Sequence, residues 1–573
     1  MSFVRDSSPS ASASLTDEPH EQSGDGASGQ RMRVNIDSRW MAVARNLFLL
    51  AVATVIGMHQ VDETGFLWAD APRYANGAAM IHDWLISGEW LHPYQFAQRY
   101  YCRYPGFNIP YHPPAYPGMM ALLFLVFGVS YATARFFIAL CLGFAGIWFV
   151  QLAKRLGAKA SVAFGGGLLL MTTPGIAYWS RTTMSEIPSL MVIMLATLLF
   201  VGWLDTAKPR YCWAAYVVAI IAFLSRMVSA GVLPAWFLYA IATRRFRLLL
   251  SPHNIAGAAI YLVFGASWVR WIKGFGLYEG GGEAAHLRLP DLQPNPSITY
   301  NLAYHWKNLP TTIGWPAIVC GALALALMVL AVKKNRGTQL WIMAVSWFVS
   351  LWIFLFVLSL REHNEPRYFC LGLPSMAIMI TALCSWGFAG SRTSRIAAAV
   401  ALGSCLCGNI YAMTKIPHGV VGYQRVAELL ANQDQRGNIL TACPRDQDFI
   451  FRYRAAGDKH VRQVMRSDRT LAIRAPNYVV VPAKVLAANA EQMIDTIRRG
   501  RIRYIITSTP PDPKIDERYR EMKMAHEVAS QRPDLFRPLG ETNGYPLLIE
   551  LGGDGRKNFL HVWEFTGELP PGP

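Results

Sequence analysis

The chain contains repeated apolar runs of about 20 residues separated by short loops, and this pattern limits its fold more than any other feature. A helical run of that length spans the hydrocarbon layer of a bilayer. Hydrophobic residues make up 53% of the 573 residues and charged residues only 16%, which excludes a single soluble domain. The sequence therefore predicts a polytopic, all-α transmembrane bundle.

The loops between the apolar runs alternate between basic and non-basic, as they do when basic loops face the cytoplasm. The basic loops contain Lys154-Arg155-Lys159, Lys208-Arg210, Arg244-Arg245-Arg247, Lys333-Lys334-Arg336 and Arg392-Arg395. This rule predicts eleven spans, near 41–59, 132–153, 160–177, 187–204, 212–226, 229–243, 254–272, 312–332, 338–360, 368–389 and 396–413. We interpret the chain as a multi-pass membrane protein, with its N-terminus cytoplasmic and its C-terminal part extracytoplasmic.

The net charge of +17 is distributed over these short basic clusters, which encode topology. A nucleic-acid partner is therefore not expected, and membrane lipids are.

One apolar run is too short to cross. Residues 115–128 follow Pro113-Pro114 and extend over only 14 residues. A crossing there would also place every later basic loop on the outer side. We predict a helix in the outer interface, within a long external loop at 60–131 that is rich in Trp, Tyr and His.

The two ends of the chain differ from the transmembrane module, predicted at 39–415. Residues 1–38 are rich in Ser, Gly and charge, which predicts a disordered cytoplasmic tail. Residues 419–573 alternate short apolar runs (438–443, 478–483, 503–508 and 546–551) with helical patterns such as 485–499, which predicts a soluble α/β domain. This domain has no Gly-rich phosphate loop and no nucleophile elbow, so we expect it to bind a partner or cover the membrane site. Cys102 and Cys443 fall on the outer side, and their pairing stays open.

Asp70 is the first candidate for chemistry, because an ionisable side chain at a membrane face is costly unless it is paired or used. It precedes Ala71-Pro72, so it is equally suited to cap the next helix. In the functional interpretation it is the general base that takes a proton from an attacking hydroxyl or amine. The two roles do not exclude each other.

Further candidates lie at the outer ends of other spans. Glu186 either occupies the acidic first turn of a helix or acts as a second carboxylate, with Asp70, for an acceptor or a divalent metal such as Mg or Mn. Arg135, Arg181 and Arg367 either snorkel or bind a lipid phosphate. The candidates that we expect to line the substrate site are Arg73, Tyr74, His363 and Glu365. Metal ligation by a histidine stays a weaker alternative, since no HExxH spacing occurs.

Several short motifs occur in a fixed order within about residues 40–390. They are Asp70, Tyr74, Pro113-Pro114, Phe127-Gly128, Arg135, Ser180-Arg181, Glu186-Ile187-Pro188, Arg367-Tyr368 and Pro374. In this order and topology the chain resembles the membrane glycosyltransferases of the C-type (GT-C) fold, specifically the branch with the protein O-mannosyltransferases and the lipid A aminoarabinose transferase.

The resemblance implies a polyprenyl-phosphate sugar as donor, inversion at the anomeric carbon, Asp70 as base and Glu186 near the donor phosphate or the acceptor. Two departures matter. Ala71 stands where the family often has Glu, which removes one metal or acceptor contact. His112 stands where the aminoarabinose transferase has the lysine of Lys-Pro-Pro, so the resemblance implies that His112 substitutes for that phosphate contact.

The sequence also admits other functions. A polytopic transporter or lipid flippase has the same apolar composition, but its polar residues are expected in mid-membrane and its halves often repeat. Here the charged candidates gather at outer loop ends and no repeat is visible. An envelope assembly protein that uses the spans only as an anchor is the third alternative. The leading hypothesis is a glycosyltransferase with an envelope acceptor, whose sugar and acceptor the sequence does not identify.

Overall fold

The structure is a computed structural model, and it describes most of the chain in two compact units, Met1–Phe48 and Leu49–Pro573. The described residues are 26–61, 65–66, 68, 70–107, 112–274, 298–333, 338–359, 366–416, 422–473, 484–508, 520–546 and 557–571. The first helix, α1 (Gly26–Met58), begins inside the predicted tail, of which residues 1–25 lie outside the described residues. Every contact discussed below lies within the second unit.

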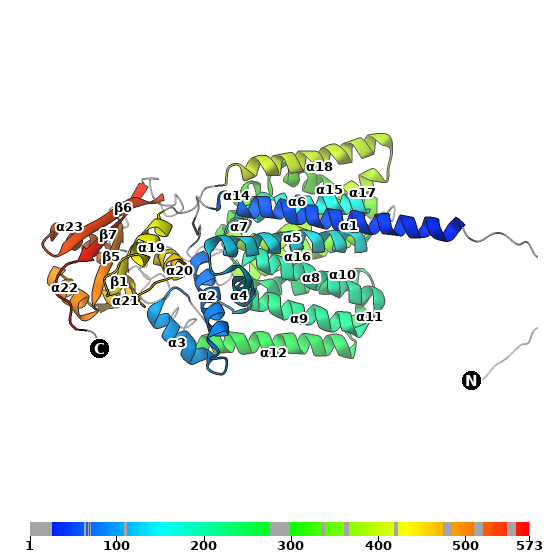
Figure 1. Cartoon of the computed structure of the whole chain (residues 1–573). Helices are drawn as coiled ribbons and strands as arrows, with labels where there is room; N and C mark the ends of the chain where they lie inside the picture. The colour runs from blue at the N-terminus through cyan, green and yellow to red at the C-terminus, as the bar shows by residue number, and fades with distance from the viewer. Residues whose placement is uncertain are drawn as a thin grey trace, which may run out of the picture. The chain divides into compact units, whose positions relative to one another are not determined.

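All eleven predicted spans are helical, but they differ in length. Seven segments within the described residues are long and apolar enough to cross a membrane. They belong to α1, α5 (Tyr131–Arg155), α8 (Glu186–Thr206), α12 (Pro252–Gly274), α16 (Thr338–Ser359), η3 with α17 (Pro366–Gly372 and Leu373–Phe388) and α18 (Arg392–Met413). The helices of the second unit lie roughly side by side as a bundle (Figure 1).

The other four predicted spans are corrected in form. Two are bent pairs. Helix α6 (Ala160–Thr172) meets α7 (Pro174–Ser180) at 61°. The part Trp306–Ile313 of α14 (Ile298–Ile313) meets the part Trp315–Met328 of α15 (Trp315–Lys333) at 111°. Pro174 breaks the first pair, and Gly314, at φ 90, the second, because proline ends a hydrogen-bond ladder and glycine tolerates positive φ. The remaining two are shorter: α9 (Pro209–Ser225), and η2 (Met227–Val232) with α10 (Leu233–Ala242).

The external loop folds into three helices, α2 (Ala71–Ser87), α3 (Pro93–Arg103) and α4 (Ala115–Phe127). Pro72 lies in the first turn of α2, and Gly88, at φ 76, ends it. The 13 residues of α4 are too few to cross a bilayer, as predicted from the sequence. The chain then enters α5, where the Ser130 side chain caps the Thr133 amide at 3.0 Å.

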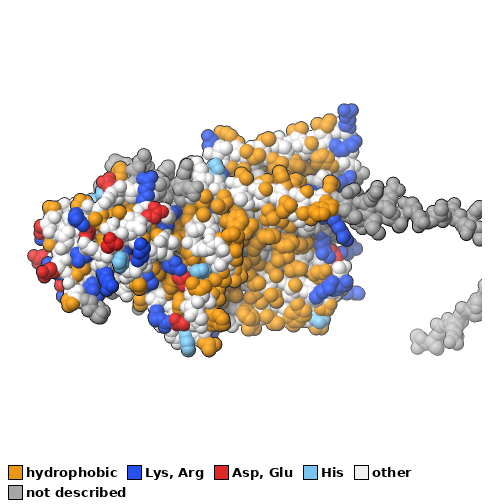
Figure 2. All heavy atoms as spheres, in the orientation of Figure 1, with side chains coloured by type: hydrophobic (Ala, Val, Ile, Leu, Met, Phe, Trp, Pro, Cys, Tyr) orange, Lys and Arg blue, Asp and Glu red, His pale blue; other side chains and the backbone are white. Residues whose placement is uncertain are grey.

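The surface of the bundle has the polarity expected of a membrane protein. Figure 2 shows an almost continuous hydrophobic band over the helices, with Lys and Arg side chains gathered at the end where α11 (Phe246–Leu249) lies. The C-terminal domain carries mixed charges on its surface. The chain is therefore a multi-pass membrane protein.

The C-terminal part forms the expected α/β domain around a five-stranded sheet of order β2-β1-β5-β7-β6, beside a β3-β4 pair. Its elements are α19 (Tyr423–Ala431), β1 (Asn438–Ala442), α20 (Asp446–Ala456), β2 (Val464–Arg466), α21 (Ser467–Thr470), β3 (Ala472–Ile473), β4 (Lys484–Val485), α22 (Ala490–Arg499), β5 (Ile502–Ser508), α23 (Arg520–Gln531), β6 (Phe536–Pro546) and β7 (Lys557–Phe565). Strands β2, β1 and β5 are parallel, and β7 and β6 are antiparallel.

The predicted strands at 438–443 and 503–508 are confirmed as β1 and β5, and the helical pattern at 485–499 contains α22. The predicted strand at 478–483 lies outside the described residues, as does the one at 546–551 beyond Pro546, which ends β6. Cys102 is exposed and Cys443 is buried, and both are free thiols.

Candidate active site

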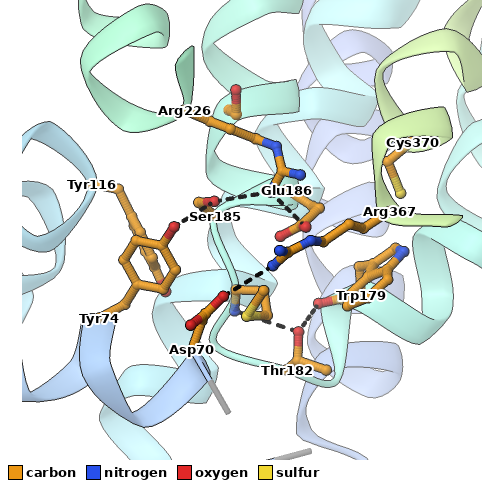
Figure 3. A network of polar contacts seen from close by, with 12 residues as sticks. Asp70, Tyr74, Tyr116, Trp179, Thr182, Ser185, Glu186, Arg226, Arg367 and Cys370 are labelled. Atoms are coloured by element: carbon orange, nitrogen blue, oxygen red, sulfur yellow. Dashed lines mark hydrogen bonds and ion pairs between the residues drawn. The ribbon is translucent and has the colours of Figure 1, made fainter. Parts of the chain in front are cut away.

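Asp70 lies at the start of α2, where its carboxylate binds two arginines instead of capping the helix. Arg73, one turn along α2, donates from Nη1 to Oδ1 at 2.8 Å. Arg367, in η3, donates from Nη1 to Oδ2 at 3.1 Å, across 297 residues of sequence (Figure 3). Nε2 of His112 lies 3.8 Å from Oδ1. The structure therefore brings together four residues that the sequence proposed separately.

The surrounding charges keep the Asp70 carboxylate ionised. Burial by itself raises the pKa of Asp70, but the positive charges of His112 in its protonated form, of Arg73 and of Arg367 outweigh it and lower the pKa to about 2. Burial lowers the pKa of His112 to about 4, so this imidazole is neutral at pH 7. The charge that stabilises the carboxylate at neutral pH therefore comes from Arg73 and Arg367. A group with so low a pKa is a weak base until one of these arginines moves away.

Glu186 is fully buried at the start of α8, where its Oε1 accepts from Nη1 of Arg226 at 2.5 Å. The same Nη1 donates to the Ser185 hydroxyl at 3.2 Å, and that hydroxyl lies 3.2 Å from the Tyr74 phenol (Figure 3). Burial and the charge of Asp70 raise the pKa of Tyr74 to about 12, so the phenol stays protonated. One polar network thus joins Glu186 to Tyr74, which neighbours Asp70.

Arg226 is the residue of this network that the sequence analysis missed. It lies between α9 and η2, in extended backbone at φ −160, inside a run that the hydropathy pattern assigned to the end of a span. An arginine within an apolar run is costly unless it is paired, and this rule would have identified Arg226 as a candidate.

Arg135 occupies a different environment from the one expected. Its guanidinium is buried in α5 and donates to the Gly57 carbonyl, from Nε at 2.9 Å, and to the Tyr131 phenol at 3.0 Å. Gly57 lies in the last turn of α1, whose carbonyls have no intrahelical donors. The expected phosphate contact of Arg135 stays a prediction, and its guanidinium would have to leave these acceptors to make it.

Arg181 follows α7 and lies close enough to Arg135 for the two charges to repel. Burial and the charge of Arg135 lower the pKa of Arg181. Its Nε is buried without a hydrogen-bond acceptor among the described residues. A half-buried guanidinium with a buried, unused donor favours an anion as its missing partner.

The residues around Asp70 do not fit a divalent metal. Both oxygens of Asp70 and one of Glu186 accept from arginines, and a cation would be repelled by these charges. The described residues contain no cluster of three or more His, Cys, Asp or Glu that would hold a metal. His363 and Glu365, expected to line the site, lie outside the described residues.

The buried, neutral His112 predicts acid-sensitive stability. An unfolded chain takes up this proton near pH 6.5, whereas the folded protein resists it down to about pH 4. Stability is therefore lost as the pH falls through this window, by about 3 kcal/mol at most. Thermal unfolding in detergent at pH 4–7 measures the effect.

His112→Gln should flatten this pH dependence, because Gln does not titrate. The exposed His92 provides the control, and His92→Gln should keep the parent profile. Equal profiles for the His112→Gln variant and the parent chain would contradict the assignment.

Comparison with known proteins agrees with this architecture. Residues 111–271 match the family described as dolichyl-phosphate-mannose-protein mannosyltransferase. The structure is similar to ArnT from Cupriavidus metallidurans bound to undecaprenyl phosphate, with a TM-score of 0.53 and 14% identity, over 92% of this chain and 99% of that one. Apo ArnT from the same organism gives a TM-score of 0.52 and 14% identity over 92% and 98%.

A third structure, the Archaeoglobus fulgidus oligosaccharyltransferase complex with Zn and sulfate, has a TM-score of 0.44 and 13% identity over 80% of this chain and 67% of that one. No curated protein matches the chain in sequence. The resemblance found in the sequence is confirmed at the level of the fold.

Proposed function

Because the chain has the C-type glycosyltransferase fold, we propose that it is an inverting glycosyltransferase. It moves a single sugar from a polyprenyl-phosphate donor to a glycan, lipid or protein acceptor of the cell envelope. The observation that carries this proposal is the ionised Asp70 carboxylate held between two arginines, one from the external loop and one from the start of a span. A carboxylate that can accept a proton, next to guanidinium groups suited to phosphate, supports this function.

In the proposed reaction the acceptor oxygen or nitrogen attacks the anomeric carbon and loses its proton to Asp70. The bond between the anomeric carbon and the phosphate oxygen breaks, and polyprenyl phosphate leaves with that electron pair. A single displacement inverts the anomeric configuration.

The arginines couple donor binding to the strength of the base. A donor phosphate attracts Arg367, and Arg181 offers an unused donor for it. When Arg367 turns to the phosphate, Asp70 loses one of its two partners, and its proton affinity rises. Arg73 stays on the other oxygen and orients the carboxylate. In this proposal His112, neutral and 3.8 Å from Asp70, donates a hydrogen bond to the phosphate in place of the family's lysine.

Glu186 has a supporting role in the proposal. One oxygen anchors Arg226, while the other, Oε2, is buried without a hydrogen-bond partner among the described residues. We expect the acceptor to use this second oxygen, because an unsatisfied buried carboxylate oxygen costs free energy.

We further propose that the site faces the outer side of the bacterial inner membrane. The basic loops then face the cytoplasm, together with the N-terminus, and the C-terminal domain is extracytoplasmic. The ArnT structure holds undecaprenyl phosphate, which supports a polyprenyl-phosphate lipid as the partner.

The experiment that tests the function is transfer by the purified protein in nanodiscs. Undecaprenyl phosphate carrying different radiolabelled sugars is offered with membrane extract as acceptor, and lipid-linked sugars are analysed in cells with and without the gene. Transfer of one sugar, and accumulation of the same lipid-linked sugar without the gene, is expected. The absence of both effects would reject the proposal.

Arg181→Ala should weaken the binding of undecaprenyl phosphate by about 10-fold or more, because a charge-assisted hydrogen bond to phosphate is lost. Native mass spectrometry of the protein in detergent measures the bound fraction. Arg210→Ala, at a basic loop of the other side, is the control and should bind as the parent does. Unchanged binding by the Arg181 variant would remove this residue from the phosphate site.

A further inference from the structure

A short segment of the C-terminal domain binds the backbone just before Asp70. Arg445 donates from Nη1 to the Phe66 carbonyl at 2.9 Å. The Phe66 amide donates to Oδ2 of Asp448 at 3.4 Å. These two bonds satisfy both backbone groups of Phe66 with side chains that lie about 380 residues further along the chain. We call Arg445 and Asp448 the clamp.

Phe66 is a fixed point in the approach to Asp70. Its side chain is fully buried, with its ring centroid 4.8 Å from that of Tyr131 and 5.4 Å from that of Phe451. Two residues later, Trp68 donates from Nε1 to the Tyr178 phenol at 2.9 Å, and its carbonyl accepts from the Ala71 amide at 3.1 Å. The position of Asp70 therefore depends on where Phe66 and Trp68 are held.

The same segment also contacts the first turns of α2. The Asn76 side-chain amide donates to the Gln447 carbonyl at 2.9 Å. This bond ties the body of the helix that carries Asp70 to the segment that holds Phe66.

The clamp is maintained at a conformational and electrostatic cost. Arg445 adopts the left-handed region, at φ 59 and ψ 38, which is unfavourable for a side chain with a Cβ. Asp448 is fully buried, and burial raises its pKa in spite of Arg452, which donates to Oδ1 at 2.6 Å. Strained backbone and buried charge persist where the surrounding structure requires them.

We propose that Arg445 and Asp448 are positioning residues, through which the C-terminal domain sets the place of the Asp70 carboxylate. They do not contact substrate. The domain thereby contributes to transfer beyond covering the membrane site. The catalytic part of this inference rests on the proposed function, whereas the structural part does not.

The test compares Arg445→Ala and Asp448→Ala with Arg454→Ala in the full-length protein in nanodiscs. Arg454 lies in α20, as Asp448 does, and donates from Nε to Oδ2 of Asp83 in α2 at 2.7 Å, so its loss weakens domain contact without touching Phe66. Hydrogen–deuterium exchange at the Phe66 and Ala71 amides is the first readout. The kcat and KM for the lipid-linked donor are the second.

Both clamp variants should exchange faster at these amides and lose about 10-fold or more in kcat, with little change in KM, because a small misplacement of a catalytic group is costly. Asp448→Asn keeps an acceptor for the Phe66 amide and should recover part of both effects. Arg454→Ala should behave as the parent does.

Unchanged exchange in the clamp variants would overturn the inference, as would equal loss of kcat in the Arg454 variant. If exchange rises in the clamp variants while the parent protein transfers no sugar, the clamp stands and the proposed function fails.

Discussion

Replacing Asp70 with Asn should abolish sugar transfer while the protein remains folded. Asparagine keeps the size of the side chain but cannot take the proton from the attacking hydroxyl or amine, so we expect kcat to fall by about 10²–10⁴-fold. Arg73 and Arg367 lose their carboxylate, but both are partly exposed and stay hydrated. Donor binding should therefore persist. Transfer assays and the elution profile of the purified variant measure the two parts of this prediction.

Asp83→Asn is the matched control for Asp70→Asn. Asp83 lies in the same helix, has a similarly buried side chain, and also pairs with an arginine. It lies outside the polar network around Asp70, so its replacement should affect stability and leave transfer near the parent level. Retained activity in the Asp70 variant, or an equal loss in the Asp83 variant, would contradict the role of Asp70 as base.

Replacing Arg226 with Met should destabilise the protein by about 3–5 kcal/mol, because it leaves the Glu186 carboxylate buried without its partner. Both side chains of this pair are almost completely inaccessible to solvent. Adding Glu186→Gln to Arg226→Met should restore much of the lost stability, since the double variant buries no charge at these two positions. Thermal unfolding in detergent of the single and double variants measures the recovery.

Arg245→Met is the control, because it removes an ion pair that is more exposed and therefore weaker. Arg245 pairs with Asp205 at the partly exposed end of α8, where Arg155 also binds the same carboxylate. We expect Arg245→Met to lower the free energy of unfolding by at most about 1 kcal/mol. If the Arg226 and Arg245 variants unfold alike, the Glu186–Arg226 pair does not have the importance assigned to it.

The arrangement of the fold was largely predictable because the insertion of a helix into a membrane depends on the local composition of the chain. Apolar length and basic loops predicted eleven spans, of which seven coincide with helices long enough to cross a membrane and the other four with bent pairs or shorter helices. The run at 115–128 is a helix too short to cross, as predicted. The breaks at Pro174 and Gly314 were not predicted. A hydropathy window averages over such residues, whereas the bend depends on one backbone position.

The candidate site was predictable only in part. Asp70 and Arg367 were proposed from their places near the outer ends of spans, Arg73 as a neighbour of Asp70, and His112 from the family resemblance. The structure brings the four together. Arg226 was missed because it lies within an apolar run. The clamp was missed because Arg445 and Asp448 belong to a domain whose sequence has no catalytic motif.

The sequence alone thus determined that the chain is a multi-pass helical membrane protein with a C-terminal α/β domain, and it singled out the carboxylate that is the candidate base, since hydropathy and charge act over short stretches of chain. The tertiary structure decided which residues contact each other across the chain. Asp70 meets Arg367 across 297 residues, and Phe66 meets Asp448 across 382. Such contacts follow from how helices and domains pack, and no local pattern encodes them. For that reason the ion pairs of Asp70 and the contacts between Phe66 and the C-terminal domain became visible only in three dimensions.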